Sequence, residues 1–225
     1  MRKFLKILIL TFLGAVTITS CSDDSDGIPG WPWSDNSTEK PDEPEVTEAK
    51  PRYIWIDAAA NFPDYANSKE NIAKDMEKIK AAGFTDIIVD VRPTTGDVLF
   101  NTNVVDQVKR MDVWSNSGYS YYERTETWDY LQAFIDEARK QELKVNASIN
   151  TFVGGYLCPY NLGHDGILFR DDSKKGWASV ANLADGLTNT MDLLDDETDY
   201  GAKFFNPAND DVQNFVLQLL ADLAK

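Results

Sequence analysis

The stretch Thr85–Thr94 reads TDIIVDVRPT, and it decides the fold class. Its aliphatic residues predict a buried strand, yet the run also carries Asp90 and ends at Arg92 and Pro93. An ionised pair inside a core usually costs more in desolvation than its attraction returns. We therefore expect Asp90 and Arg92 to lie where a ligand, rather than a core, receives them.

Two further stretches share this pattern, in which every second residue is aliphatic and the residues between them become polar. Residues at every second position share one face of a strand, and we call such a set one parity. Residues 53–57 read YIWID, and residues 143–149 read LKVNASI. The polar parity includes Asp57 in the first stretch and Asn146, followed by Asn150, in the second. Helical patterns follow, beginning near residue 67, near residue 127 and after residues 206–207. Alternating strands and helices predict a parallel sheet covered by helices.

The phase of the polar residues favours a barrel over an open doubly wound sheet. An open sheet of that kind buries both parities under helices, whereas a (β/α)8 barrel turns one parity into a lumen whose carboxyl end holds the active site. The long segments 92–127 and 151–208 would then be loops that build the site, and their aromatic residues, such as Trp114 and Tyr156, would suit sugar C–H faces. We expect an α/β fold, a (β/α)8 TIM barrel of which about the first three βα units are present.

The first 50 residues have the features of a bacterial lipoprotein. A basic start, an apolar run too short to span a bilayer, and the lipobox-like Ile18-Thr-Ser-Cys21 predict a signal peptide over 1–20 and lipidation of Cys21. An ordinary secretory signal that happens to contain a cysteine is the alternative. Residues 21–50 are acidic and contain prolines, which predicts a disordered linker. The expected location is the outer membrane or cell surface of a Gram-negative bacterium, with the lipid as the only contact to the membrane.

Composition excludes several partners. The formal net charge is −15, which argues against nucleic acid and against an anionic membrane surface. The single histidine, His164, argues against a histidine-based metal site. The acidic residues between 192 and 199 lack the glycine-containing spacing of a calcium loop. No metal and no cofactor are predicted.

Four segments carry a resemblance to a known family: RYIWIDAAANF, IKAAGFTDIIVDVRPTTGDVLFNT, KVNASINTF and FFNPANDDVQNFV. Together they resemble the glycosyl hydrolase-like 10 family of bacterial secreted or lipid-anchored barrels, over roughly residues 50–225. The positions that fall on the family's pattern are Trp55, Ile56, Asp57, Gly83, Phe84, Val91, Arg92, Pro93, Asn150, Asn206 and Pro207.

The resemblance implies a surface-anchored glycoside hydrolase-like protein that acts on a polysaccharide or oligosaccharide. A non-catalytic glycan-binding lipoprotein is the alternative. In the family, a fourth strand with further carboxylates follows the third helix, whereas this sequence ends within that helix at residues 223–225. On this basis, residues 51–225 are expected to be the truncated N-terminal part of the barrel, inactive alone, with a second carboxylate beyond residue 225.

The candidate site residues follow from the strand ends, the aromatic loops and the resemblance. A glycosidase needs two carboxylates at the scissile bond; Asp57 and Asp90 are the candidates within this sequence, and the resemblance implies a partner carboxylate beyond residue 225. The expected substrate-binding residues are Asp57, Asp90, Arg92, Asn146, Asn150, Trp114, Tyr156 and Asn206. Structural alternatives are helix capping for Asp57, an ion pair between Asp90 and Arg92, and loop hydrogen bonding for Asn150.

Overall fold

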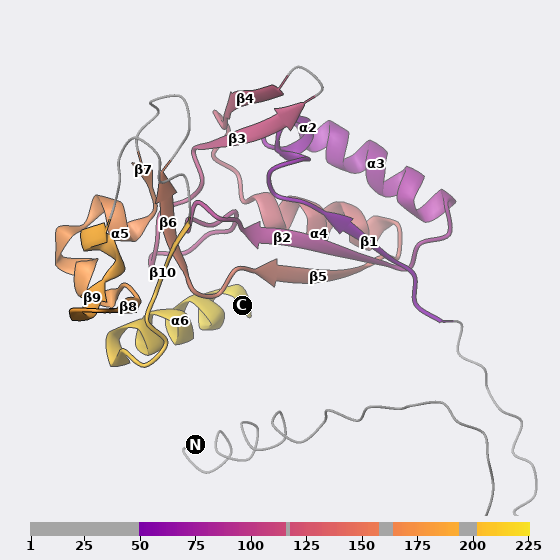
Figure 1. Ribbon diagram of the computed structural model, residues 1–225. Helices are drawn as coiled ribbons and strands as arrows, with labels where there is room; N and C mark the ends of the chain where they lie inside the picture. The colour runs from indigo at the N-terminus through magenta and orange to yellow at the C-terminus, as the bar shows by residue number, and fades with distance from the viewer. Residues whose placement is uncertain (1–49, 116–117, 158–163, 194–201) are drawn as a thin grey trace, which may run out of the picture. The chain divides into compact units, whose positions relative to one another are not determined.

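The computed structural model describes residues 50–115, 118–157, 164–193 and 202–225 (Figure 1). The chain divides into two units, Met1–Glu48 and Ala49–Lys225, and all of the described residues belong to the second. The predicted signal peptide, the lipidation site Cys21 and nearly all of the predicted linker therefore lie outside the described residues. None of the helices in the described part is long and apolar enough to cross a membrane.

A three-stranded parallel sheet forms the centre of the fold, in the order β1-β2-β5. The strands are β1 (Tyr53–Ile56), β2 (Asp86–Arg92) and β5 (Lys144–Ile149). Each lies within a residue of the position that its aliphatic alternation predicts. The aliphatic parities are in register, because Ile54 pairs with Ile87 and Ile87 pairs with Val145.

Helices cover the aliphatic face of this sheet. In Figure 1 strands β1 and β2 pass in front of α4 (Tyr130–Lys140), and α3 (Lys69–Ala81) runs beside that helix, after the short helix α2 (Phe62–Tyr65). Ser68 and Asp129 cap α3 and α4 with side-chain oxygens that accept backbone N–H bonds, which satisfies the free amides of the first turn. Buried side chains from both helices join those of β2 in one hydrophobic core: Ile72, Met76, Phe134, Ile87 and Val89.

The rest of the described chain forms antiparallel sheets and short helices. Strands β3 (Arg110–Ser115) and β4 (Gly118–Glu123) pair with each other, as do β8 (Val180–Leu183) and β9 (Gly186–Asn189). Strands β6 (Val153–Leu157), β7 (His164–Asp165) and β10 (Ala202–Phe204) form a sheet in the order β10-β6-β7. The remaining elements are α5 (Ile167–Arg170), the 3-10 helices η1 (Asp172–Trp177) and η2 (Thr190–Leu193), and α6 (Asp210–Leu223).

The expected (β/α)8 TIM barrel is therefore wrong. Among the strands of the described residues only β1, β2 and β5 pair in parallel, and the other strands form three small antiparallel sheets, whereas every strand of such a barrel is parallel to its neighbours. The segments expected to be barrel loops pair in antiparallel fashion instead. The local pattern of each strand was right, but closure depends on how strands pair, which no single strand encodes.

Two glycines of β6 allow the antiparallel part to pack closely. A Cβ atom on Gly154 would lie 2.3 Å from Leu168 Cδ1, and one on Gly155 would lie 2.2 Å from the carbonyl oxygen of Asp165. Gly155 also has a φ of +140°, which side chains disfavour. Close packing of β6 against β7 and α5 thus requires the absence of side chains at these positions.

Candidate functional site

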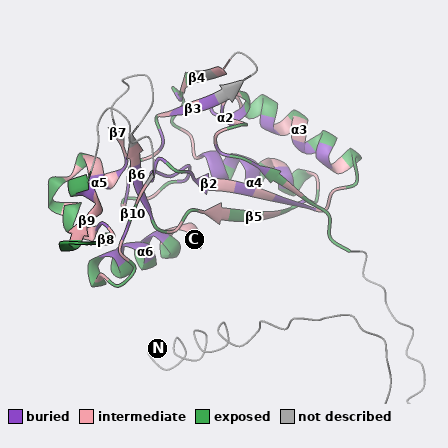
Figure 2. Cartoon of the chain, viewed as in Figure 1, coloured by how far each residue is buried: buried purple, intermediate pink, exposed green. Residues whose placement is uncertain are grey.

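The second face of the parallel sheet is open and carries aromatic and polar side chains. Tyr53 is 51% exposed and Trp55 is 54% exposed, and Asp57 and Asn146 are exposed as well. Figure 2 shows exposed residues along β1, in contrast to the mostly buried residues of β2. A large exposed aromatic surface on a strand marks a binding surface more often than an isolated exposed leucine does.

The strand register sets two rows of side chains on this face. In the first row Trp55 lies opposite Ile88, and Ile88 lies opposite Asn146. In the second row Asp90 lies opposite Ser148, and continuation of the β1–β2 register by one residue places Asp57 beside Asp90. Neighbouring strands are about 4.8 Å apart. The sheet therefore brings the two candidate carboxylates together at its carboxyl edge.

Asp90 has an unusual titration. Burial raises the pKa of its half-buried carboxyl group from 3.8 to about 6, the backbone N–H of Arg92 opposes that rise, and the negative charge of Asp57 adds to it. The hydrogen bond from Arg92 N to Asp90 Oδ1 is 3.3 Å long. Asp90 is thus a carboxyl group that keeps its proton in mildly acidic solution, as a general acid must.

Asp57 has a structural role at the same place. Its Oδ1 accepts backbone N–H bonds from Ala59 (2.8 Å) and Ala60 (2.7 Å), and its own N–H donates to Asn61 Oδ1 (3.0 Å). These bonds close the turn from β1 into α2, so the capping alternative describes part of what Asp57 does. They also hold its carboxylate in a fixed orientation beside Asp90.

Arg92 does not face the site. It is fully buried, and its guanidinium donates to the carbonyl oxygens of Asn150, Thr151 and Val153. The register between β2 and β5 shifts between Asp90 and Arg92, and such a bulge re-aims the side chain that follows it. Burial lowers the pKa of Arg92 to about 10, which still leaves it cationic at neutral pH. Instead of the expected substrate contact and the ion pair with Asp90, Arg92 makes hydrogen bonds that link β2 to the start of β6. We call this set of hydrogen bonds the Arg92 brace.

The predicted asparagines divide between the site and the scaffold. Asn146 lies on the open face, and its Nδ2 donates to the carbonyl of Ile87 (3.2 Å). Asn150 belongs to the Arg92 brace, because its Nδ2 and its backbone N–H both donate to the Arg92 carbonyl (3.0 and 3.1 Å). Asn206 forms the turn before α6, where its Oδ1 accepts the N–H of Ala208 (3.0 Å).

The two predicted aromatic residues lie on the antiparallel strands. The Tyr156 hydroxyl on β6 donates to Asp112 Oδ2 on β3 (2.6 Å), which ties the two sheets together. Trp114 lies on β3, and its side chain is outside the described part of the chain. Of the expected set, the structure brings Asp57, Asp90 and Asn146 together on one face.

The aromatic residues of this face were not among the predicted site residues. Tyr53, Trp55 and Asp57 share one parity of the first strand, and this parity was the available signal. A second missed residue is Tyr130, whose buried hydroxyl has no hydrogen-bond partner among the described residues. Burial raises the pKa of Tyr130, and the negative charges of Asp90 and Asp57 act in the same direction, which places all three groups within electrostatic reach of one another.

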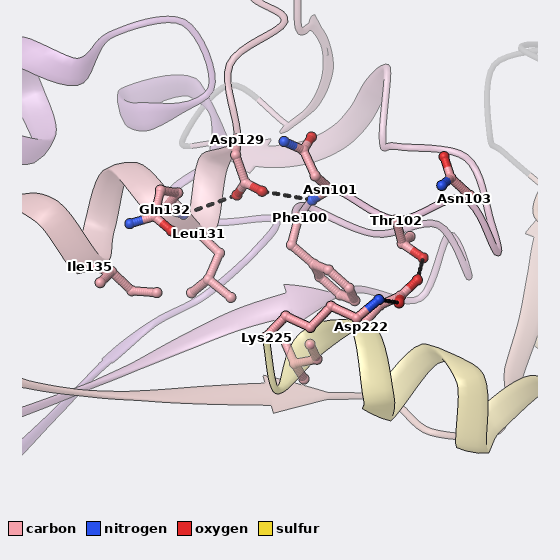
Figure 3. Close-up of a pocket in the computed structure, with 11 residues that line it drawn as sticks. Phe100, Asn101, Thr102, Asn103, Asp129, Leu131, Gln132, Ile135, Asp222 and Lys225 are labelled. Carbon is pink, nitrogen blue, oxygen red and sulfur yellow. Dashed lines mark hydrogen bonds and ion pairs between the residues drawn. The ribbon is translucent and has the colours of Figure 1, made fainter.

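Figure 3 shows a different hollow, of about 460 Å³, between residues 100–103, α4 and the end of α6. Its carboxylates already have partners in the protein. Asp129 accepts the N–H groups of Asn101 (2.7 Å) and Gln132 (2.9 Å). Asp222 accepts from the Thr102 hydroxyl and from Lys225 Nζ, both at 2.6 Å. These contacts explain the hollow as a junction between α4, α6 and the loop rather than as a site of chemistry.

A third hollow, of about 320 Å³, is lined by ion pairs. Arg170 donates to both oxygens of the buried Asp97 (2.8 and 2.5 Å), and Arg110 pairs with Asp165 (3.2 Å). Bidentate pairs of this kind fix geometry. They join α5 and β7 to the segment between β2 and β4.

Comparison with known proteins gives one distant relative. The chain is 26% identical over 185 residues to an S-layer-related protein of Niallia circulans. The match covers 80% of this chain and 11% of the relative, so the chain spans about a tenth of the relative's length. No family model matches the chain. The resemblance to the glycosyl hydrolase-like 10 family therefore stays a prediction.

Proposed function

We propose that this chain is part of a carbohydrate-active protein of the cell surface, with Asp90 as proton donor and Asp57 as the second carboxylate. The observation that carries the proposal is the placement of Asp57 and Asp90 at the carboxyl edge of a parallel sheet, where burial raises the pKa of Asp90. A pair of carboxyl groups in different environments is the usual way in which an enzyme assigns acid and base roles at one site.

The proposed chemistry is hydrolysis of a glycosidic bond on the open sheet face. Asp90 would donate its proton to the leaving oxygen as the glycosidic C–O bond breaks, and the oriented carboxylate of Asp57 would stabilise the positive charge at the anomeric carbon. A water molecule would supply the hydroxyl group that bonds to this carbon and the proton that restores Asp90. Asp57 and Asp90 come from neighbouring parallel strands, which lie about 4.8 Å apart, and two carboxyl groups flanking one glycosidic bond need such a side-by-side placement.

The proposed location is extracytoplasmic. The distant relative is named as an S-layer-related protein, which supports a cell-surface location. The basic and apolar start of the chain and its lipobox-like sequence support the same conclusion from the sequence. Lipidation at Cys21 and attachment to the outer membrane of a Gram-negative bacterium belong to the proposal.

Release of reducing ends tests the hydrolytic step. The full chain would be incubated with xylan, glucomannan, laminarin and hydroxyethyl cellulose at pH 5.5. We expect Asp90→Asn to lower the release at least 100-fold and Asp57→Asn to do the same, because each keeps the hydrogen-bonding shape but loses the carboxyl chemistry. The control is Asp136→Asn, an exposed position on α4. Equal release by Asp90→Asn and wild type would refute the assigned role.

The second candidate is a surface protein that binds glycan without cleaving it. The turn that Asp57 closes favours this function, because those bonds explain its presence without catalysis. Polysaccharide binding without any release of reducing ends would select this candidate.

A further inference from the structure

We propose that Tyr53 and Trp55 form a stacking track for a neutral, linear polysaccharide that runs along β1 toward Asp57. The inference rests on the proposed function and adds to it the substrate class and the direction of the chain. The track consists of these two side chains and the row of Trp55, Ile88 and Asn146 that crosses the sheet.

The spacing of the aromatic rings carries the first step. Tyr53, Trp55 and Asp57 lie two residues apart on one parity, so neighbouring members are separated by about 6.8 Å along the strand. Both rings are more than half exposed, although β1 is paired and its other parity is packed in the core. A flat aromatic face offers a negative π surface to the C–H groups of a pyranose ring. A sugar stacked on Trp55 therefore lies one position from the carboxylates.

The polar groups of the face select a neutral ligand. Beyond Trp55, the second row carries the carboxyl groups of Asp57 and Asp90 and the hydroxyl of Ser148. In the first row, the Oδ1 of Asn146 remains as an acceptor, because its hydrogen bond to Ile87 uses Nδ2. Amide and hydroxyl groups suit sugar hydroxyls, whereas two neighbouring carboxyl groups repel a polyanion such as polygalacturonate.

A second copy of this chain is the other occupant that an open aromatic face could take. The formal net charge of −15 disfavours this pairing, because two such chains repel each other. The carboxylates at the edge of the same face would also be buried against each other, which is costly without cationic partners. The face is better matched to a neutral partner.

Affinity gel electrophoresis tests the track without catalysis. The full chain carrying Asp90→Asn, which removes the proposed proton donor, would migrate through gels containing xylan, glucomannan, laminarin, hydroxyethyl cellulose or polygalacturonate. Adding Trp55→Ala should weaken binding to at least one neutral polymer about tenfold, whereas Trp55→Phe should stay within about threefold because it keeps a ring. Tyr53→Ala should have an intermediate effect. The control is Leu187→Ala, which removes a 74% exposed apolar side chain from β9.

The outcomes separate this inference from the proposed hydrolysis. Loss of binding in Trp55→Ala, with no reducing ends from the wild type, supports the track and refutes hydrolysis by this chain alone. Release of reducing ends that depends on Asp90, with binding unchanged in Trp55→Ala, refutes the track alone. Preference for polygalacturonate, absence of binding to every neutral polymer, or a dimer by light scattering that Trp55→Ala dissociates would each overturn the track.

Discussion

Asp90→Asn should change how stability depends on pH. The native protein keeps the Asp90 proton up to about pH 6, whereas an unfolded chain releases it near 3.9. Between these values the native state binds more protons than the unfolded state, so the free energy of unfolding falls as pH rises. The contribution of Asp90 is fully present below about pH 4 and is lost by about pH 6–7.

The size of this effect follows from the same numbers. A rise in pKa from 3.8 to about 6 corresponds to at most about 3 kcal/mol between the two protonation states. Asp90 is only partly buried, so solvent screening reduces the expected value to about 1–2 kcal/mol. Asparagine keeps the acceptor for Arg92 N–H but does not titrate.

Urea unfolding of wild type and Asp90→Asn at pH 4.0 and pH 7.5 measures the effect. We expect the wild type to lose about 1–2 kcal/mol relative to the variant between these two pH values. Asp136→Asn is the matched control and should follow the wild type. If the wild type and Asp90→Asn differ in free energy of unfolding by the same amount at both pH values, the burial argument is refuted. If the wild type instead gains stability relative to the variant as pH rises, Asp90 is stabilised as an anion.

Three further substitutions test the packing that supports the site. Tyr130→Phe should stabilise the protein by about 1 kcal/mol in urea unfolding, because it removes a buried hydroxyl without a partner; destabilisation would reveal a bond that this structure lacks. Gly154→Ala should lower the free energy of unfolding by about 1–3 kcal/mol, because the added Cβ would overlap Leu168, whereas the control Gly176→Ala meets open space and should be neutral. Equal melting temperatures of these two variants would contradict the close packing. Arg92→Lys should lower the free energy of unfolding by about 1–3 kcal/mol in urea, because lysine cannot donate to all of the carbonyl oxygens that the guanidinium bridges. An unchanged free energy of unfolding would contradict the Arg92 brace.

The sequence predicted the parallel sheet well because its strands are encoded locally. Aliphatic residues at every second position fix both the strand and the face that it buries. The same parity predicted that Asp57 and Asp90 point to one side, and continuing the register one residue past the Ile56–Val89 pair places them next to each other. Helix starts were less accurate: the pattern indicated Asn67, whereas Ser68 is the cap of α3 and Asn67 instead binds the Glu123 carbonyl.

The position of Arg92 and the antiparallel sheets could not be predicted, because they depend on contacts that no local sequence pattern contains. A shift of one residue reverses the face of every side chain that follows it, and such a shift separates Arg92 from Asp90. The antiparallel pairing of β6 with β10 joins residues that are far apart in sequence, and it relies on glycines whose role appears only in the folded chain. The barrel prediction failed for the same reason, because it took the segments after β2 and β5 for loops, whereas they form antiparallel sheets through pairings that the three parallel strands do not specify.

The pKa of Asp90 tests the central claim most directly. The resonance of its side-chain carboxyl carbon would be followed by NMR between pH 3 and pH 8, in the wild type and in Asp57→Asn. A midpoint near pH 6 that falls when the neighbouring carboxylate is removed is the predicted result. A midpoint near pH 4 in both proteins would contradict the account, because Asp90 would then be an ordinary surface carboxylate with no proton to donate.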